Sequence, residues 1–241
     1  MAIKTENRVN IILIFLVAIT FLCAAYNDCV LYDFHYIDDF IIRELSSPFY
    51  ICYYLPFSFL LLWSLLYKKT IKKPLKTQIV RCAIKSLCFV ICSIVILILA
   101  YLLYNGYKIR GEKVLIDSDN AMSVLEIILY SIFLNTLRLG FYYLCVSTLN
   151  LLTHKCIGFL SILVMVFIDR WAYECFNVLY PIGITPIEHT AVFYVEAMAP
   201  AIPPYTRFPI GLSILYWLIV ISLFILLKAV LMTRGIKNEF E

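Results

Sequence analysis

Long apolar blocks divide this sequence, and they constrain its fold more than any other feature. Most are about 18–25 residues long, the length that crosses the hydrocarbon core of a bilayer as an α-helix. We expect six membrane spans, at about residues 9–26, 49–67, 86–104, 124–152, 157–176 and 210–232. Of the 241 residues, 63% are hydrophobic and 15% are charged, whereas soluble domains are about half apolar and a quarter charged. The sequence therefore predicts an all-α integral membrane protein with a single transmembrane domain.

The segment between the second and third spans sets the predicted orientation. Residues 68–85 hold six lysines, one arginine and no acidic residue. Lys and Arg in short loops are retained on the cytoplasmic side during insertion, so we expect this basic loop there. Alternation of the spans then places both termini in the cytoplasm. It places the acidic residues 27–47 outside. Cys29 and Cys175 would then both lie near the outer face, and the sequence leaves undecided whether they form a disulfide.

Local signals refine the first two spans. The charged start of the first span also suits a signal peptide, and we expect a retained span. After it, Phe34, Ile37 and Ile41 recur at helical spacing. Two interpretations remain for these residues: a helix lying on the membrane surface, or an extension of the first span into water. Pro56 lies inside the second span and predicts a kink there.

Residues 177–209 are rich in proline yet largely apolar, and they form the external segment between the fifth and sixth spans. Thr185, Pro186 and Glu188 match a capping box with proline at the first helical position. The helix that starts there must end before Pro200. At roughly 14 residues it is too short to cross a bilayer. We therefore expect a re-entrant or interfacial helix.

The polar side of that short helix carries Glu188, His189 and Glu196. Their spacing matches no zinc signature, and His35 and His154 are predicted on loops at opposite faces of the membrane. We therefore expect no metal site, and we expect this polar side to face water or the exit of a translocation path.

Ionised side chains inside the spans are the sharpest signal, because each is costly in hydrocarbon unless it is paired or hydrated. Arg138 and Asp169 lie at nearly equal distances along the helices from the inner turn at residues 153–156, roughly 21–22 Å at about 1.5 Å per residue. We predict that they pair; Glu174 is the alternative partner of Arg138 if the helix is rotated, and Arg170 and Glu174 are the secondary polar residues near the outer end. The pair would either line a hydrated pathway or lock one conformation, or it would only pin two spans together.

The basic loop has two interpretations. Pro74 favours the start of a helix on which Leu75, Ile79 and Cys82 share one face, with basic side chains on the others. A short amphipathic helix between two spans is a place where a soluble motor could contact the membrane part. Alternatively, the loop only sets the topology and rests on anionic lipid, at about 1 kcal/mol per basic residue.

Several motifs are absent from the sequence, and their absence excludes classes of activity. There is no phosphate-binding loop of the form GxxxxGK[ST], no HExxH, no GxSxG and no cluster of Cys and His ligands. The formal net charge of +4 reflects membrane orientation and indicates no nucleic-acid partner. We therefore expect a protein that is not itself an enzyme.

The layout resembles the permease subunits of the ABC type-2 transporter family. The resemblance rests on six spans with both ends inside, the basic loop 68–85, and the proline-rich segment 177–209 with its short helix. It is similar to bacterial permeases encoded beside a separate ATPase, including exporters of antimicrobial or amphipathic peptides. The family implies a homo- or heterodimer of six-span subunits in the bacterial cell membrane, moving a hydrophobic or amphipathic substrate by alternating access.

The resemblance also assigns roles within the chain. A cytoplasmic ABC ATPase would hold ATP and Mg²⁺, so that this chain would need no cofactor of its own. Thr185–Ala199 would form the external re-entrant element. The expected ATPase contacts are Lys72, Lys73, Leu75, Lys76, Ile79 and Arg81.

Two other classes of function stay open. A membrane subunit that captures a vitamin for a shared uptake complex would also have six spans and no ATPase. It should have a closed, ligand-sized pocket within one subunit, whereas an exporter half has its path between subunits. An accessory or immunity protein that holds a toxin or a partner in the bilayer would need no ATPase at all.

Overall fold

A computed structural model shows a bundle of helices and one small hairpin in the part of the chain that it describes. That part comprises residues 2–47, 49–66, 74–111, 114–117, 120–153, 160, 163–164, 166–168, 171, 189–190 and 210–238. The elements, in chain order, are the helices and strands α1 (Ala2–Tyr32), α2 (Ile37–Ser46), the π-helix η1 (Phe49–Tyr54), α3 (Leu55–Leu66), α4 (Leu75–Asn105), β1 (Val114–Asp117), β2 (Asn120–Met122), α5 (Val124–Thr153) and α7 (Ile210–Asn238).

Within the described residues, four helices are long and apolar enough to cross a membrane. They comprise Ile12–Tyr32 of α1, all of α4, Val124–Leu149 of α5 and Ile210–Thr233 of α7. Each of them overlaps a predicted span. The helical, membrane-embedded class expected from the apolar blocks is thereby supported by the length and composition of the helices themselves.

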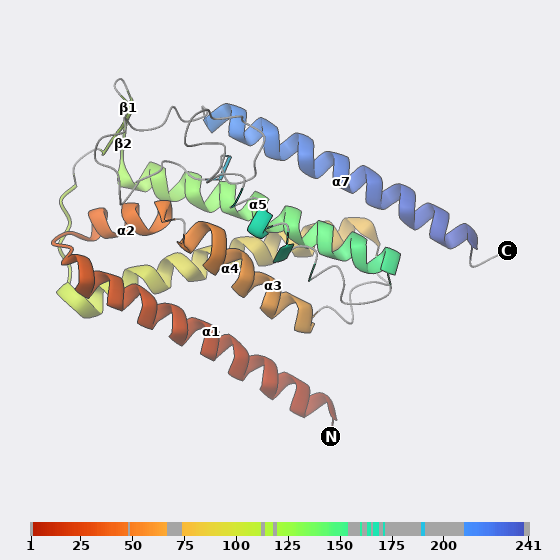
Figure 1. The fold of residues 1–241 in the computed structure, drawn as a ribbon, viewed down its shortest axis with the longest axis horizontal. Helices are drawn as coiled ribbons and strands as arrows, with labels where there is room; N and C mark the ends of the chain where they lie inside the picture. Colours follow the sequence, from red (N-terminus) through yellow and green to blue (C-terminus); the bar gives the residue numbers. More distant parts are fainter. Residues whose placement is uncertain are drawn as a thin grey trace.

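α4 and α5 form the centre of the bundle. α1 packs along α4, α4 packs along α5, and α5 packs along α7, while α3 contacts α1, α4 and α5. Figure 1 shows α1 and α7 as the outermost helices, with the start of α1 and the end of α7 at the same end of the bundle. α2 and the hairpin lie at the opposite end.

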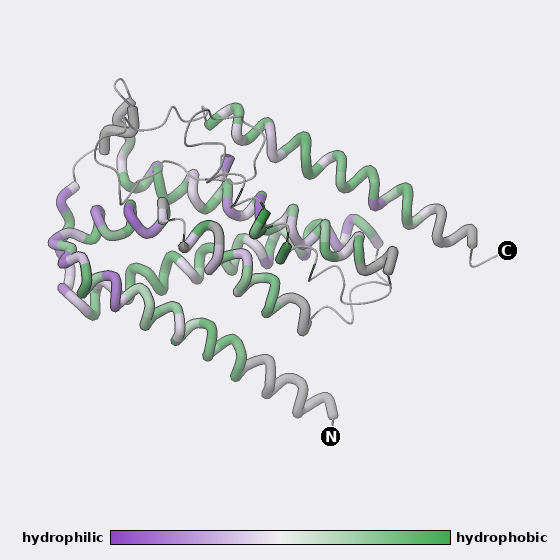
Figure 2. The backbone as a smooth tube through the Cα atoms, viewed as in Figure 1, coloured by the Kyte–Doolittle hydropathy of each residue, from purple (hydrophilic) through white to green (hydrophobic). Residues whose placement is uncertain are grey.

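The outward faces of the long helices are apolar. Figure 2 shows hydrophobic residues along α1, α4 and α7, and hydrophilic residues gathered at the end of the bundle where α2 lies. On α4 the exposed large apolar residues follow helical spacing and comprise Val80, Ile84, Leu87, Ile91, Val95, Leu99 and Leu103. A stripe of this kind, exposed over the length of a span, is suited to contact with lipid.

α4 is longer than the third predicted span. It begins at Leu75 rather than Ser86, so the basic residues 75–85 form its first turns and not a separate short helix. Pro74 precedes it in an extended conformation, and Gly106 follows it at φ 69°, a left-handed conformation that glycine adopts at no steric cost. Hydropathy marks the part of a helix that suits lipid, and it does not mark where the helix begins.

A capping box starts α5 at the predicted residue. The N–H and Oγ of Ser123 both donate to Oε2 of Glu126, each at 2.8 Å, and the N–H of Glu126 donates to Oγ of Ser123 at 3.3 Å. These bonds satisfy donors that the first turn of a helix otherwise leaves unpaired. The fourth predicted span, 124–152, therefore matches the observed helix closely.

The second predicted span consists of two helical pieces. The π-helix η1 ends at Tyr54 and α3 begins at Leu55, one residue before Pro56. Proline cannot donate a backbone hydrogen bond and crowds the preceding turn. The irregularity therefore lies where the sequence placed a kink.

α2 does not lie with its apolar face on the membrane surface, and it is not an extension of α1. Its apolar side chains Phe40, Ile41 and Leu45 are buried against α4, α5 and η1. The ring of Phe40 stacks on that of Tyr101 of α4, with the centroids 5.8 Å apart. The helical spacing indicated the helix correctly, but its apolar face covers the end of the bundle.

Hydrogen bonds attach α2 to the segment that follows α4. The N–H of Ile37 donates to the carbonyl of Lys108 at 3.0 Å, and the N–H of Gly111 donates to Oδ2 of Asp38 at 2.8 Å. Beyond this segment β1 and β2 pair antiparallel, a hairpin that the sequence did not predict. α2 and the segment after α4 thus form one cover over this end of the bundle.

Replacing Phe40 with alanine should remove the main apolar contact of α2. We expect Phe40→Ala to lower the free energy of unfolding by about 3–5 kcal/mol, because a fully buried aromatic side chain leaves a cavity. The measurement is reversible unfolding in detergent micelles. Leu31→Ala is the control, because Leu31 is 66% exposed. Equal losses of stability in the two variants would contradict the conclusion that Phe40 anchors α2 to the bundle.

Candidate functional site

Arg138 lies in the centre of the bundle. It is fully buried on α5, and its Nη1 donates to the carbonyl of Ile51 in η1 at 2.7 Å. Its Nε donates to the hydroxyl of Tyr142 at 3.0 Å, one helical turn further along the same helix. The guanidinium therefore joins α5 to the π-helix.

Pro56 explains why the carbonyl of Ile51 can accept this bond. In a π-helix each carbonyl accepts from the N–H five residues later, and the residue five after Ile51 is Pro56, which has no N–H. An unsatisfied carbonyl in a lipid-embedded bundle costs several kcal/mol. Arg138 supplies a donor to it, so two residues far apart in the sequence form one unit.

The predicted partner of Arg138 lies outside the described residues. Asp169, Arg170 and Glu174 are not among the residues that the structure describes, so the Arg138–Asp169 pair stays a prediction. Sequence reasoning missed the bond to Ile51. Pro56 was the signal that could have indicated it, because a proline inside a span has no backbone N–H and leaves a carbonyl of the preceding turn without its usual donor.

Lys228 is a second buried cation. It lies on α7, is fully buried, and its Nζ donates to Oγ of Ser147 on α5. The thiol of Cys82 on α4 lies close by, with its Sγ 3.6 Å from the carbonyl of Gly140. Lys228 lies near the end of the sixth predicted span, and its burial between three helices was not foreseen from the sequence.

The two cations occupy different depths along α5. Arg138 and the Ser147 partner of Lys228 are separated by about 14 Å along the helix axis, at about 1.5 Å per residue. Several small or polar side chains on α4 and α5 are buried, namely Cys82, Ser86, Ser131 and Asn135. Small residues let membrane helices approach closely, and polar ones bond across the interface. The α4–α5–α7 side therefore contains buried polar side chains beside its apolar and aromatic ones.

His189 does not face water. It is 3% exposed, and it lies in a turn with Thr190. Its Nδ1 lies 3.2 Å from Oγ of Ser213, its carbonyl accepts from Nε1 of Trp217 at 2.8 Å, and its ring stacks on Tyr216 at 4.1 Å. The expected polar, water-facing side of a short helix is therefore wrong for this residue, because His189 packs on the start of α7.

The other residues of that predicted helix are not described by the structure; they are Thr185, Pro186, Glu188 and Glu196. Within the described part, no group of three or more His, Cys, Asp or Glu side chains lies close enough together to hold a metal ion.

The basic residues of the predicted ATPase contact occupy the first turns of α4. Lys76 and Arg81 are exposed, while Leu75 and Ile79 are partly buried and Cys82 is buried. The predicted apolar face is therefore turned to the bundle, while the exposed side carries Val80 and Ile84 beside the basic residues. Lys72 and Lys73 lie outside the described residues.

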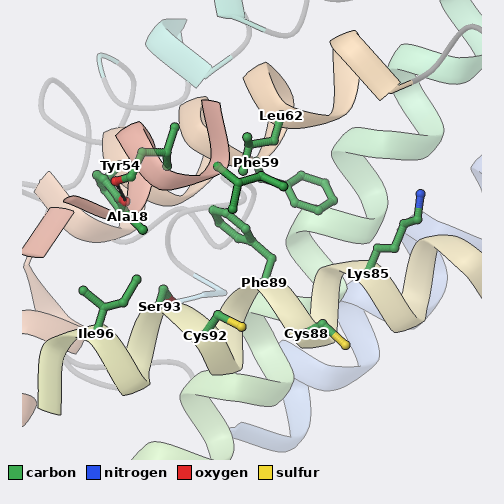
Figure 3. A pocket seen from close by; sticks show the side chains of 12 residues that line it. Ala18, Tyr54, Phe59, Leu62, Lys85, Cys88, Phe89, Cys92, Ser93 and Ile96 are labelled. Atoms are coloured by element: carbon green, nitrogen blue, oxygen red, sulfur yellow. Dashed lines mark hydrogen bonds between the residues drawn. The ribbon is translucent and has the colours of Figure 1, made fainter. Parts of the chain in front are cut away.

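A lateral groove of about 350 Å³ lies on the other side of α4. Its walls come from α1, from η1 and α3, and from α4, and Figure 3 shows Phe59 and Phe89 facing each other across it. The groove is apolar along most of its length, and Lys85 lies at one end. It is partly open, since Cys88 and Cys92 on its rim are exposed.

Glu44 is a buried carboxyl on α2, outside the four candidate spans. It is 4% exposed, and burial, reinforced by Asp28, raises its pKa to about 8, against a smaller opposing effect of Arg43. The guanidinium of Arg43 lies 3.3 Å from the ring centroid of Tyr32. Cys29 nearby is a buried free thiol, so the disulfide that the sequence left open is not formed at this residue.

Comparison with known proteins gives no relative from which a function could be transferred. No family model matches the chain, and no curated protein or solved structure matches it. The function must therefore be argued from the arrangement of the residues themselves.

The bond between Arg138 and Ile51 can be tested with a double-mutant cycle. Arg138→Leu should lower the free energy of unfolding by about 1–3 kcal/mol, because it leaves a buried acceptor without that donor. In a Pro56→Ala background the loss should be smaller, because an N–H is restored to the same turn. Unfolding in mixed micelles measures both effects, and strictly additive losses would contradict the link between Pro56 and Arg138.

Glu44 predicts a pH dependence of stability. Its folded pKa, about 8, lies above its ordinary value of 4.5, so the folded state binds the proton more tightly than the unfolded state. The contribution of Glu44 to the stability of the fold is complete below pH 4.5 and is lost as the pH rises through about 8. The free energy of unfolding should fall by on the order of a few kcal/mol over this range. Thermal unfolding between pH 5 and 9 should show this decline.

Two variants isolate the contribution of Glu44. Glu44→Gln carries no titrating group at this position and should flatten the decline between pH 5 and 9. Asp39→Asn, at an exposed position on the same helix, should keep it. Parallel curves for the wild type and Glu44→Gln would show that another group is responsible.

Proposed function

We propose that this chain is the membrane-spanning permease subunit of an ABC transporter, exporting a hydrophobic or amphipathic substrate such as a peptide. One observation carries the proposal: the exposed basic turns around Lys76 and Arg81 are continuous with α4, the helix at the centre of the bundle. A motor that bound these turns would act directly on the helix that contacts α1, α2, α3 and α5.

The course of the chain supports a six-span topology with both termini cytoplasmic. The start of α1 and the end of α7 lie at the same end of the bundle, as do the end of α5 and the start of α4 (Figure 1). α7 begins at the other end, so the chain has to return across the bundle between Thr153 and Ile210. η1 with α3 would be the second span and residues 157–176 the fifth.

The described residues of the proposed fifth span support it further. They are helical and comprise Leu160, Leu163, Val164, Val166, Phe167, Ile168 and Trp171. Val166 is fully buried, whereas Leu160, Val164, Phe167, Ile168 and Trp171 are exposed; the ring of Phe167 still contacts Phe57 of α3, with the ring centroids 5.6 Å apart. A helix with one face on the bundle and one exposed apolar face is typical of a span. Residues 177–209 would then be external and would hold the re-entrant helix.

On this proposal the energy comes from a partner. A cytoplasmic ABC ATPase would bind ATP and Mg²⁺, a second permease subunit would complete the dimer in the bacterial cell membrane, and the present chain would hold no cofactor and no nucleic acid. ATP can drive alternating access only if it binds one state of the assembly better than the other. The substrate path would lie between the two permease subunits.

The second candidate is a capture or accessory protein of the membrane. The lateral groove favours it, because the groove lies within a single chain, as expected of a subunit that captures its ligand alone. A vitamin-binding subunit or an immunity protein that holds its partner in the bilayer would use such a site without an ATPase.

Co-purification from native membranes separates the two candidates. A permease subunit should carry an ATPase with it, and the double variant Lys76→Glu, Arg81→Glu should release that ATPase through charge reversal at the exposed turns. Lys108→Glu reverses a single charge beyond the other end of α4. The chain with this substitution should still carry the ATPase with it. Recovery of the chain with lipid or a small ligand alone, with no ATPase, would contradict the permease proposal and support the second candidate.

A further inference from the structure

The lateral groove combines a long apolar wall with a basic end. Among the residues that line it, Val17, Tyr54, Phe59, Phe89 and Ile96 are apolar or aromatic, and Lys85 is the ionised residue. In Figure 3, Lys85 and Ile96 lie at opposite ends of the row of α4 side chains. The groove therefore has one end that attracts an anion and a body that excludes polar groups.

The hydroxyl groups in the wall are already engaged. The hydroxyl of Tyr54 donates to the carbonyl of Val17 at 3.1 Å. Oγ of Ser93 donates to the carbonyl of Val90 at 2.7 Å and lies 2.6 Å from the hydroxyl of Tyr50. A polar ligand would have to compete with these bonds, whereas a hydrocarbon chain would leave them intact. The wall therefore suits an alkyl chain.

The wall is also built before any ligand arrives. The ring of Tyr54 stacks on Phe21 of α1 at 3.8 Å, and the rings of Phe59 and Phe89 lie 5.5 Å apart. Aromatic pairs of this kind fix their neighbours and lower the ordering cost of binding.

The length of the groove matches one leaflet. Lys85 and Ile96 are separated by about 16 Å along α4, at about 1.5 Å per residue, and one leaflet contributes about 15 Å of a hydrocarbon core about 30 Å thick. Arg81 precedes Lys85 by one turn and is exposed on the same side of α4. An acyl chain in the groove would thus place its headgroup beside two basic residues.

We propose that the groove binds one acyl chain of an anionic phospholipid from the surrounding bilayer, with the phosphate at Lys85 and Arg81. Anionic headgroups are attracted to basic residues at the membrane surface, and the apolar wall accounts for the chain. Lipid binding in the groove requires a membrane but no ATPase partner. A test of it is therefore independent of the proposed transport function.

The test is lipid retention by the full chain in nanodiscs that contain equal amounts of phosphatidylglycerol and phosphatidylcholine with identical chains. After mild detergent extraction, native mass spectrometry should show one retained phosphatidylglycerol per chain. Lys85→Gln should reduce the preference for phosphatidylglycerol about fivefold, the equivalent of about 1 kcal/mol for one basic residue. Lys76→Gln is the matched control, since Lys76 is exposed on the same helix but does not line the groove.

Two further variants fill the groove instead of changing its charge. Ala18→Phe and Cys92→Phe add bulk at its lining from α1 and from α4, and each should abolish retention of the bound lipid while the chain remains monodisperse. Cys92 is exposed, so its substitution keeps the test valid should Ala18→Phe fail to fold. Unchanged retention in the folded variants would overturn the proposal.

Other outcomes also overturn it. Equal retention of both phospholipids would remove the role of the basic end, and an equal loss in Lys76→Gln would indicate diffuse surface attraction. Recovery of a free fatty acid or a peptide from the groove would show a different occupant.

Discussion

Backbone N–H and C=O groups in hydrocarbon must find partners within the protein, and the whole bundle depends on this requirement. α1, α4, α5 and α7 meet it by their own helical bonds. The segment of η1 and α3 does not, because Pro56 has no N–H. A π-helix forms there, and Arg138 of α5 donates to the carbonyl of Ile51 at 2.7 Å. A proline in one helix thereby accounts for a buried cation in another.

α4 connects the different parts of the molecule. Its first turns carry the exposed basic residues, its middle contacts α1 and α5, and its last turns hold α2 through the stack of Phe40 on Tyr101. A displacement at the basic end would reach the cover at the other end through a single continuous helix. This continuity is the feature on which the proposed coupling to a motor depends.

The two sides of α4 differ in chemistry. Towards α5 and α7 the buried residues include Arg138, Lys228 and several small polar side chains. Towards α1 and α3 the groove is apolar, and the hydroxyls of Tyr54 and Ser93 are bonded within the wall. Polar residues in the first region stabilise helix contacts, whereas the second region can admit a hydrocarbon chain. α4 therefore separates a packed interior that contains buried cations from an apolar groove.

The sequence by itself determined the elements that depend on local order: the four apolar helices of span length in the described part of the chain, the irregular turn at Pro56 and the existence of α2. Only the tertiary structure decided that α2 turns its apolar face into the bundle, that Lys228 meets Ser147, and that Arg138 reaches Ile51. Hydropathy and spacing are properties of neighbouring residues, whereas these contacts depend on which helices pack together and how each is rotated about its axis.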